Sequence, residues 1–388
     1  MGLFERIFGP KDKQKQAQAG VVYQGITAYQ PHFYASSGSI YEQMLIRESI
    51  HALAVHSSKL RITFNGRGAM QLEKRLGLQP NALQTWDQML YRTRTILETE
   101  NTCILAPAFD KYGRVSEIYP ILPSSCVLTG DTAEPMVAMR FPSGGFVQLP
   151  TWQVGVLTKF QYRDDFFGST NAALRKTIDL LGYQDQGIEQ ALRNAASYRF
   201  MACSRNFASP DDLKKQRKEF DKNNMSGEGG GILLFPNTFG DPKQIQNDHY
   251  TIDAETMKII KDNIHGYFGT NDDVTHNKAY GDAWSAFYEG GVEPFAIQLS
   301  NVLTILLSMV GELTGGAFVM ATANRLQYMS NSDKLKVTAQ LIDRGVMCVD
   351  DGREIWNLPP LPDGKGQVYR IRGEYKDAAD ENGVHEED

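Results

Sequence analysis

The sequence has few cysteines, and their spacing excludes two common uses of this residue. The four cysteines, Cys103, Cys126, Cys203 and Cys348, lie far apart among 388 residues, and no Cys-x-x-Cys pair occurs. Disulfide scaffolds and zinc sites need several cysteines at close, regular spacing. The sequence therefore predicts reduced structural thiols, as in a cytosolic protein.

The sequence also lacks an excess of basic residues and a long hydrophobic run. It contains 40 Lys and Arg against 46 Asp and Glu, a net charge of −6. This balance excludes a protein that binds nucleic acid over its whole surface, and leaves room for a local basic patch. The best apolar run, Val302 to Val310, is interrupted by Thr304 and Ser308 and falls short of the ~20 residues that span a bilayer. We therefore expect no membrane segment.

An apolar face at the amino terminus has a different expected use. Leu3, Phe4, Ile7 and Phe8 fall on one helical face, but the segment is short, carries Glu5 and is followed by a polar run. We expect residues 1–19 to form an arm that docks on this subunit or on a neighbouring one.

Motifs for catalysis and for phosphate or metal binding are missing. The glycines at 227–231 follow a predicted helix and precede a predicted strand, the reverse of a phosphate-binding loop. His51 and His56 are five residues apart and do not share a helical face. Residues 271–273 begin like a calcium loop but lack its alternate ligands and closing Glu. We therefore predict no catalytic residue, no metal site and no cofactor.

The first part of the chain mixes helices and strands. Residues 40–59 and 83–100 have helical periodicity, and Asn81 is the expected N-cap of the second helix. The predicted strands are Leu60–Phe64, Cys103–Ala106, Val115–Tyr119, Val137–Phe141 and Phe146–Leu149, most of them separated by Gly, Pro and Asp turns. These patterns predict a mixed α+β domain that ends near Asp165.

Two long amphipathic helices follow, with a small insert between them. From Ser169 one apolar stripe continues for about thirty residues, and residues 251–268 predict the second helix. In the insert, Phe200–Phe207 and Ile232–Phe235 are predicted strands around a helix at 209–224. Ser209 is the expected N-cap of that helix, because Pro and two carboxylates follow it. The sequence thus predicts a β-α-β insert.

A turn-rich stretch and a long apolar helix come next. Residues 269–281 hold too many turn-forming residues to be helical throughout. The helical pattern resumes from Trp284 to Val310, where Pro294 lacks an N–H and is expected to introduce a kink beside two glycines. The remaining predictions are a strand at 318–322, helices at 333–344 and 350–357, and an acidic, disordered tail at 361–388.

The order of these elements resembles the portal proteins of tailed bacteriophages, in particular the HK97-type family. The opening Leu-Phe-Glu-Arg-Ile-Phe-Gly is similar to that of the family, Leu76–Asn81 to its Leu-x-x-x-Pro-Asn, and Phe167–Ser169 to its Gly-x-Ser before the first stem helix. Residues 345–360 resemble its closing Gly, Asn-Glu-x-Arg and Gly-Leu-Pro-Pro pattern. There Asp350 and Asn357 stand for Asn and Gly, which preserves an expected N-cap and C-cap.

The resemblance implies an α+β portal-protein fold in a ring of twelve subunits at one capsid vertex, around a channel for double-stranded DNA. The implied regions are an N-terminal arm (1–19), an α+β wing (20–168), stem helix 1 (169–198), a small β-α-β clip (199–250), stem helix 2 (251–268), a tunnel loop with a kinked tunnel helix (269–313), a return strand to the wing (314–328), a short helical crown (329–360) and the acidic tail (361–388).

Partners and location follow from the same resemblance. The implied partners are further copies of the chain, the terminase large subunit, a head-to-tail connector or adaptor, and the major capsid protein with a scaffold or protease. DNA would pass through without sequence specificity. The implied location is the portal vertex of the virion, and the host cytoplasm during assembly.

Candidate contact residues can be placed on this frame. Those for the channel are Asn271, Asp272, Asp273, Thr275, His276, Asn277 and Lys278; those for the stem are Lys258 and Lys261; those for docking at the clip are Asp211, Asp212, Lys214, Lys215 and Lys218; and the kink is assigned to Pro294. Few basic residues near the tunnel loop suit sliding passage, because each Lys or Arg paired with a phosphate adds affinity.

Two other classes of function are open to a chain of this composition. A hydrolase would use Asp164 and Asp165 as acid and base, but adjacent residues of a strand point to opposite faces. A sequence-reading DNA-binding protein needs a basic face that the composition does not supply. Neutralising the two carboxylates tests the first alternative, and a steep salt dependence of DNA affinity would favour the second.

Overall fold

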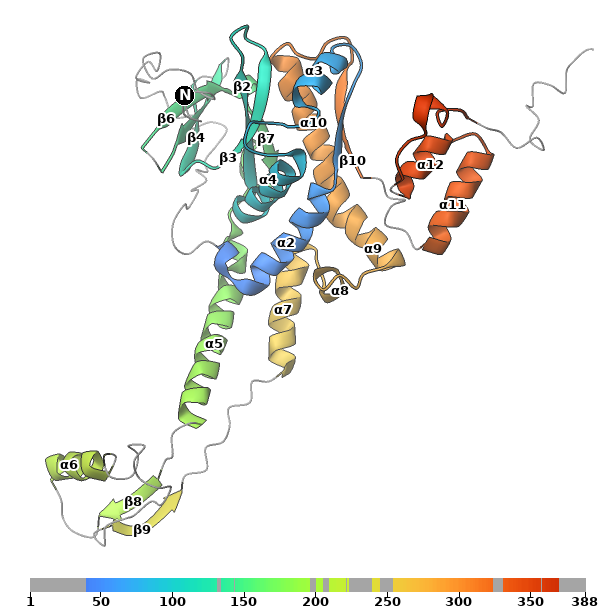
Figure 1. The fold of residues 1–388 in the computed structure, drawn as a ribbon. Helices are drawn as coiled ribbons and strands as arrows, with labels where there is room; N and C mark the ends of the chain where they lie inside the picture. Colours follow the sequence, from blue (N-terminus) through green and yellow to red (C-terminus); the bar gives the residue numbers. More distant parts are fainter. Residues whose placement is uncertain are drawn as a thin grey trace, which may run out of the picture. The chain divides into compact units, whose positions relative to one another are not determined.

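The computed structural model describes residues 40–130, 134–142, 144–195, 200–204, 209–220, 222, 239–244, 254–323, 331–356 and 358–369. Its contacts divide the chain into two units, which are described separately (Figure 1). The first comprises Met1–Arg175 and Lys261–Asp388, and the second comprises Lys176–Ile260.

The described helices of the first unit are α2 (Met44–Ser58), α3 (Ala69–Leu76), α4 (Trp86–Glu100), the carboxyl end of α7 (Ala254–Phe268), α8 (Asp272–Thr275), α9 (Gly281–Phe287), α10 (Glu293–Met309), α11 (Asn331–Asp343) and α12 (Val349–Ile355). Its short 3-10 and π segments are η2 (Ile40–Glu42), η3 (Thr151–Gln153), η4 (Asn171–Leu174), η6 (Tyr288–Val292) and η8 (Pro362–Gly364). Its strands are β1 (Arg61–Asn65), β2 (Thr102–Phe109), β3 (Val115–Ile121), β4 (Ser125–Gly130), β5 (Pro135–Arg140), β6 (Phe146–Pro150), β7 (Gly155–Thr158) and β10 (Phe318–Thr322).

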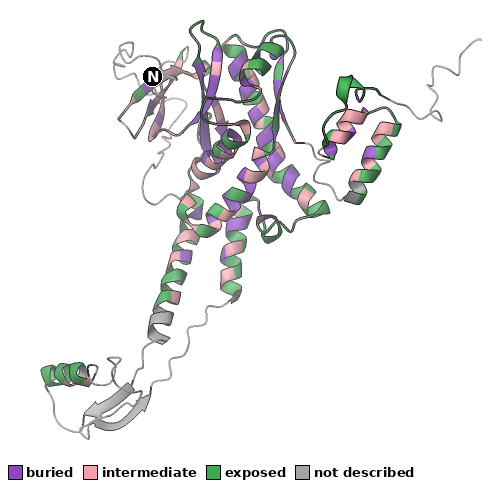
Figure 2. Cartoon of the chain, in the orientation of Figure 1, coloured by how far each residue is buried: buried purple, intermediate pink, exposed green. Residues whose placement is uncertain are grey.

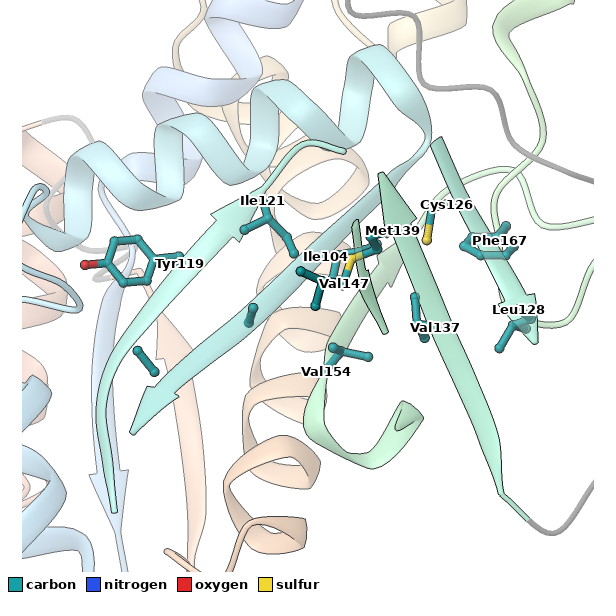
Figure 3. Close-up of a cluster of buried hydrophobic side chains, with 12 residues drawn as sticks. Ile104, Tyr119, Ile121, Cys126, Leu128, Val137, Met139, Val147, Val154 and Phe167 are labelled. Atoms are coloured by element: carbon teal, nitrogen blue, oxygen red, sulfur yellow. The ribbon is translucent and has the colours of Figure 1, made fainter. Parts of the chain in front are cut away.

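Two antiparallel sheets share one hydrophobic core, as Figure 3 shows. Their strand orders are β3-β2-β7 and β4-β5-β6. Ile104 and Tyr119 come from the first sheet, Val137 and Met139 from the second, and Phe167 from the segment after β7. The predicted α+β character of this part is confirmed, but β4 and β7 were not predicted. Short strands containing Ser and Gly acquire their identity from pairing more than from local pattern.

A third pairing joins segments that are far apart in the sequence. β1 pairs antiparallel with β10, and Asn65 lies opposite Phe318. α10 packs against β10: Thr304 Oγ1 accepts a hydrogen bond from Val319 N (2.9 Å), and Ser300 Oγ accepts one from Ala321 N (2.9 Å). The polar residues that interrupt this apolar helix therefore attach it to the strand.

Among the described residues, the helical stretch Gly281–Met309 is, by its length and composition, apolar enough to cross a membrane. The core helix of a water-exposed domain passes the same test. Leu299, Leu303 and Leu307 in this stretch are fully buried, which is the pattern of a core helix.

The cysteines lie in the core. Cys103, Cys126 and Cys348 are free and buried, as the sequence predicted; the side chain of Cys203 is outside the described residues. Burial raises the pKa of Cys103 to about 12 and also raises that of Cys126. A thiol that stays protonated is a poor nucleophile and metal ligand, so the two act as small apolar side chains.

The start of α4 differs from the prediction. Asn81 is not its cap: the side chain is buried, and its Nδ2 donates a hydrogen bond to Ile118 O (2.9 Å). The N-cap is Thr85, in a capping box with Gln88, whose Oε1 accepts from Thr85 N (3.1 Å). The Asn81 side chain, which the local sequence had assigned to the helix cap, is thus bound by the distant strand β3.

The end of α4 gives a prediction on pH. Burial raises the pKa of Glu100 to about 7 from its ordinary 4.5, so the folded chain favours the neutral carboxyl. Because the folded pKa lies above the unfolded one, the stabilisation is complete below about pH 4.5 and is lost as the pH rises through about 7. Between pH 5 and pH 8, we expect the free energy of unfolding to fall by about 2 kcal/mol less in Glu100→Gln than in the unsubstituted protein. Thermal unfolding of the variant and of the unsubstituted protein at pH 5 and pH 8 measures this difference. The same loss of stability between the two pH values in both proteins would contradict the prediction.

The kink assigned to Pro294 has a defined structure. The α-helical pattern breaks in the π turn η6, which contains Gly290 and Gly291 and lies directly before α10. Pro294 is the second residue of α10, a position where its missing N–H is tolerated. The interruption therefore precedes the proline, and the carbonyl that it crowds lies four residues earlier, at Gly290.

The second unit contains α5 (Arg175–Ala195), β8 (Phe200–Ser204), α6 (Pro210–Phe220), β9 (Phe239–Gln244) and the first turns of α7. β8 pairs antiparallel with β9, which was not predicted because Gly, Asp and Pro are depleted in strands. The predicted cap of α6 is confirmed, because Asp212 N donates to Ser209 Oγ (3.3 Å). The predicted strand at 232–235 lies outside the described residues.

The start of α12 also departs from the prediction. Its N-cap is Cys348, not Asp350: the Asp351 carboxylate accepts from Cys348 N (2.9 Å), and Asp351 N donates to Cys348 Sγ (3.4 Å). The expected C-cap Asn357 lies outside the described residues. The N-cap therefore lies two residues earlier than expected, and it forms a capping box with Asp351.

Asp350 instead holds the chain that follows α12. Its Oδ1 accepts a hydrogen bond from Leu361 N (2.8 Å), and its backbone N donates to Gly366 O (3.0 Å). Residues 361–369 therefore fold back on the helix, and the predicted tail at 361–388 begins too early. Residues 370–388 lie outside the described part.

Candidate channel and subunit interfaces

The turn-rich stretch after α7 is an ordered corner. Asn271 is the N-cap of α8, and its Oδ1 accepts from Val274 N (2.9 Å). His276 Nδ1 donates to the Asp272 carbonyl (2.8 Å), and Thr275 Oγ1 donates to the same oxygen (3.2 Å). As predicted, the stretch is not helical throughout. Its polar side chains are partly used to build the turn itself.

Two candidate contact residues are paired with each other. Lys261 Nζ on α7 lies 2.7 Å from Asp272 Oδ1, and the buried His265 Nε2 lies 3.5 Å from the same oxygen. The hydrogen bond from Lys261 lowers the pKa of Asp272, while burial lowers the pKa of His265 and keeps it neutral at pH 7. The Lys261–Asp272 ion pair neutralises one positive and one negative charge, and it attaches the turn that contains α8 to α7.

The rest of the corner faces solvent. Asp273, His276, Asn277 and Lys278 are exposed, and Asn277 adopts a left-handed conformation with φ of 57° that Asn tolerates. The adjacent Tyr280 is 78% exposed. The structure therefore brings the predicted channel residues 271–278 into one short turn, in which Lys278 N donates a hydrogen bond to Asp273 O (2.6 Å).

The helices that the sequence assigned to a stem, α5 and α7, each carry both buried and exposed residues (Figure 2). On α5, Leu181 is buried, while Leu180 and Tyr183 are 56% and 70% exposed. On α7, Ile260 is buried, while Ile259 is 54% exposed and Lys258 is exposed. Exposed apolar residues that lie together on helices are typical of surfaces that contact another protein.

α10 has a similar exposed stripe. Ile297, Ile305 and Met309 are all more than half exposed and, with the exposed Asn301, recur at intervals of four residues. No charged residue occurs from Pro294 to Gly311. A solvent-facing helix surface normally carries charges, so this stripe also has the character of a contact surface.

The docking candidates of the insert lie on α6. Asp211, Asp212, Lys214, Lys215 and Lys218 are all exposed, and Lys214 Nζ lies 3.7 Å from Asp211 Oδ1. An ion pair at this exposure contributes little to stability. Asp212 Oδ2 also accepts a hydrogen bond from Ser209 Oγ (2.8 Å), while the side chains of Lys215 and Lys218 are exposed.

The carboxylates of the hydrolase alternative do not face each other. Asp164 is 5% exposed, and its Oδ1 accepts hydrogen bonds from Phe166 N (2.8 Å) and Phe167 N (3.0 Å). Asp165 is exposed. Asp164 thus organises a backbone turn. Within the described part of the chain, no group of three or more His, Cys, Asp or Glu side chains is placed to hold a metal ion.

Several solved structures share this fold. A chain in the neck of a native gene transfer agent (GTA) particle, computed with C12 symmetry, matches with a TM-score of 0.58 and 15% identity, over 83% of this chain and 92% of that one. An HK97 family phage portal protein from Corynebacterium diphtheriae matches with a TM-score of 0.50 and 11% identity, over 75% of this chain and 96% of that one. At such identities the similarity shows the fold alone.

Sequence comparison identifies the family. No curated protein matches the sequence. The family model described as phage portal protein matches residues 45–357, which include α2, both sheets, α5 to α10 and α12. The chain therefore belongs to the phage portal protein family, with the α+β fold of HK97-type portals.

Proposed function

We propose that this portal protein assembles into a ring of twelve subunits at one vertex of a capsid and conducts double-stranded DNA during packaging and ejection. The subunit has no catalytic role in this proposal. The ring would dock the terminase large subunit during packaging and a head-to-tail connector afterwards. It would also contact the major capsid protein, with a scaffold or protease during assembly in the host cytoplasm.

The observation that carries the proposal is the second apolar face on the helices. Leu180 and Tyr183 of α5, Ile259 of α7, and Ile297 and Ile305 of α10 are exposed in the single subunit. A copy on each side would cover such faces if the contact is head-to-tail, because contacts of that type close into rings by rotation. The neck structure with C12 symmetry supports the number twelve for this fold.

The charges around the corner at 269–281 suit a channel that does not retain DNA. Lys261 is already paired with Asp272, and Lys278 follows the acidic Asp272 and Asp273 in the same turn. Each phosphate neutralised by a cation adds affinity, and a ring would repeat every contact twelve times. We propose that the exposed residues Asn271, Asp273, His276, Asn277 and Lys278 border the channel.

The proposed regions follow the observed elements. We assign the two sheets with α2 to α4 and β10 to a wing, α5 and α7 to a stem, and β8, α6 and β9 to a clip. In this assignment α8 to α10 form the tunnel corner and tunnel helix, and α11 with α12 forms the crown. The exposed charges of α6 would meet the motor and then the connector.

The mass of the native full-length chain tests the proposal. Twelve copies of a 43.4 kDa chain give a ring of about 521 kDa, which native mass spectrometry separates from a monomer or dimer. Negative-stain images would show a central hole wide enough for a duplex. The proposal fails if the chain stays monomeric both alone and when co-expressed with its capsid protein.

A substitution on α5 tests which face meets the neighbour. We expect Tyr183→Asp to leave the subunit folded, because Tyr183 is 70% exposed in the single subunit. The same substitution should abolish the ring, because contact with a neighbouring copy would bury an unpaired carboxylate. Asp185→Lys changes the charge of an exposed residue on the opposite side of the same helix and should leave the ring intact. Size-exclusion chromatography with light scattering measures both, and a ring formed by Tyr183→Asp would place the contact elsewhere.

A further inference from the structure

A buried ionic cluster in the first unit has its centre at Glu98 on α4. Glu98 Oε1 lies 2.7 Å from Arg94 Nη2, and Oε2 lies 2.5 Å from Lys159 Nζ. The side chain of Glu98 has no exposure, and those of Arg94 and Lys159 are 7% and 23% exposed. One buried carboxylate therefore pairs with two cations. Because little water reaches the cluster, a change at one of the two ion pairs strongly affects the other.

Arg94 connects this cluster to the interrupted helix. Its Nη1 donates a hydrogen bond to Gly291 O (3.0 Å) in the π turn, and its guanidinium lies 5.0 Å from the centroid of the Phe295 ring. The two contacts fall on either side of Pro294, where the helical hydrogen-bond ladder is incomplete. Arg94 thus holds the point at which the π turn passes into α10.

Asn171 and Tyr267 connect the cluster to the segment before α5 and the end of α7. Tyr267 Oη donates to Asn171 Oδ1 (2.6 Å), and Asn171 Nδ2 donates to Thr99 O (2.7 Å) in the last turn of α4. The Lys159 ammonium also lies 6.0 Å from the centroid of the Tyr267 ring. The Tyr267 side chain therefore reaches Glu98 by two routes, through the end of α4 and through Lys159.

The hydrogen bonding of the cluster is incomplete. Glu98 Oε1 approaches Arg94 at ion-pair distance without forming a hydrogen bond, and within the described residues Arg94 Nε and Asn101 Oδ1 have no hydrogen-bond partner. Buried polar groups are nearly always bonded, so this arrangement does not satisfy all its members. Small shifts of Arg94 can exchange one contact for another.

We propose that Glu98 couples the junction of Asn171 and Tyr267 to the π turn at Tyr288–Val292. The element with two states is the turn, since Gly290 and Gly291 permit a change between π and α bonding when Arg94 releases the Gly291 carbonyl. When the contacts of Tyr267 loosen, Lys159 and the end of α4 shift, and Glu98 moves with them. The hydrogen bond from Arg94 to the Gly291 carbonyl then weakens. This coupling lies within one subunit and does not depend on the proposed ring.

Hydrogen exchange of the full-length protein, followed by mass spectrometry, tests the coupling. Tyr267→Phe removes one hydroxyl and leaves the ring in place. We expect it to accelerate exchange in peptides covering 288–296 on the order of fivefold, the size of a modest coupling between contacting residues. Tyr183→Phe, the same change at an exposed site on α5, should leave these peptides unchanged.

A second variant separates coupling from general loosening. In a Glu98→Gln background the carboxylate charge is gone, so adding Tyr267→Phe should not change exchange at 288–296 further. If Glu98→Gln does not fold, Arg94→Lys serves the same purpose, because an ammonium lacks the fork that reaches both Glu98 and Gly291. The proposal is overturned if Tyr267→Phe affects only 169–175 and 261–268, or if its effect on 288–296 persists in both backgrounds.

Discussion

Replacement of Gly168 by alanine is expected to destabilise the fold by about 3–5 kcal/mol. A Cβ at this position would lie 2.1 Å from Asn101 O and 2.3 Å from Lys159 O, far inside van der Waals contact. Both obstacles are backbone atoms of a fixed arrangement, since Lys159 N itself donates to Asn101 O (2.9 Å). Gly168 N donates to Thr102 Oγ1 (2.9 Å), so the glycine has little room to move away.

The matched control is Gly182→Ala in the middle of α5. Nothing lies within 4 Å of the added Cβ there, and alanine is the better helix former by about 1 kcal/mol. Thermal unfolding should therefore move in opposite directions for the two variants, with a large decrease of Tm for Gly168→Ala. Equal Tm values for both would show that the chain around Gly168 can relax, contrary to this expectation.

The second large effect is expected for Glu98→Ala, which should destabilise the chain by about 3–5 kcal/mol. The substitution leaves Arg94 and Lys159 buried near each other without a counter-charge. Burial already lowers the pKa of Lys159, and Glu98 opposes that shift, so its loss should promote release of the lysine proton. Denaturant titration measures the loss of stability.

The control is an ion pair of the same chemistry at the surface. Arg61 Nη1 lies 2.5 Å from Glu354 Oε1, but the two side chains are 70% and 53% exposed. Arg61→Ala should therefore change stability by no more than about 1 kcal/mol. If the two substitutions have the same effect, burial is not what makes the Glu98 cluster important.

Features fixed by residues close in sequence were predicted well. The cap of α6 followed from Ser209 and the carboxylates after it, and the strand predicted at 318–322 is observed as β10 with the same bounds. The family was reached in the same way, because its motifs are short and occur in order along the chain. The error at Asn81 arose because a strand more than thirty residues away binds its side chain.

The contacts that hold the candidate site together were not predictable in this way. Lys261 was expected to be a contact residue of the stem, yet it is paired with Asp272 across a turn. Glu98 and Lys159 are 61 residues apart, and neither had a local pattern that distinguished it from a surface charge. Burial decides the role of a charged residue, and burial depends on the whole fold.

The pairing of β1 with β10 has a consequence for synthesis of the subunit. Residues 61–65 find their strand partner only after more than 250 further residues have been made. Closing so large a loop is slow, and the nascent chain keeps the edge of β1 unpaired until then. A polypeptide that ends before residue 318 lacks both the partner strand of β1 and the strand on which α10 packs, so it should be less stable than the whole chain.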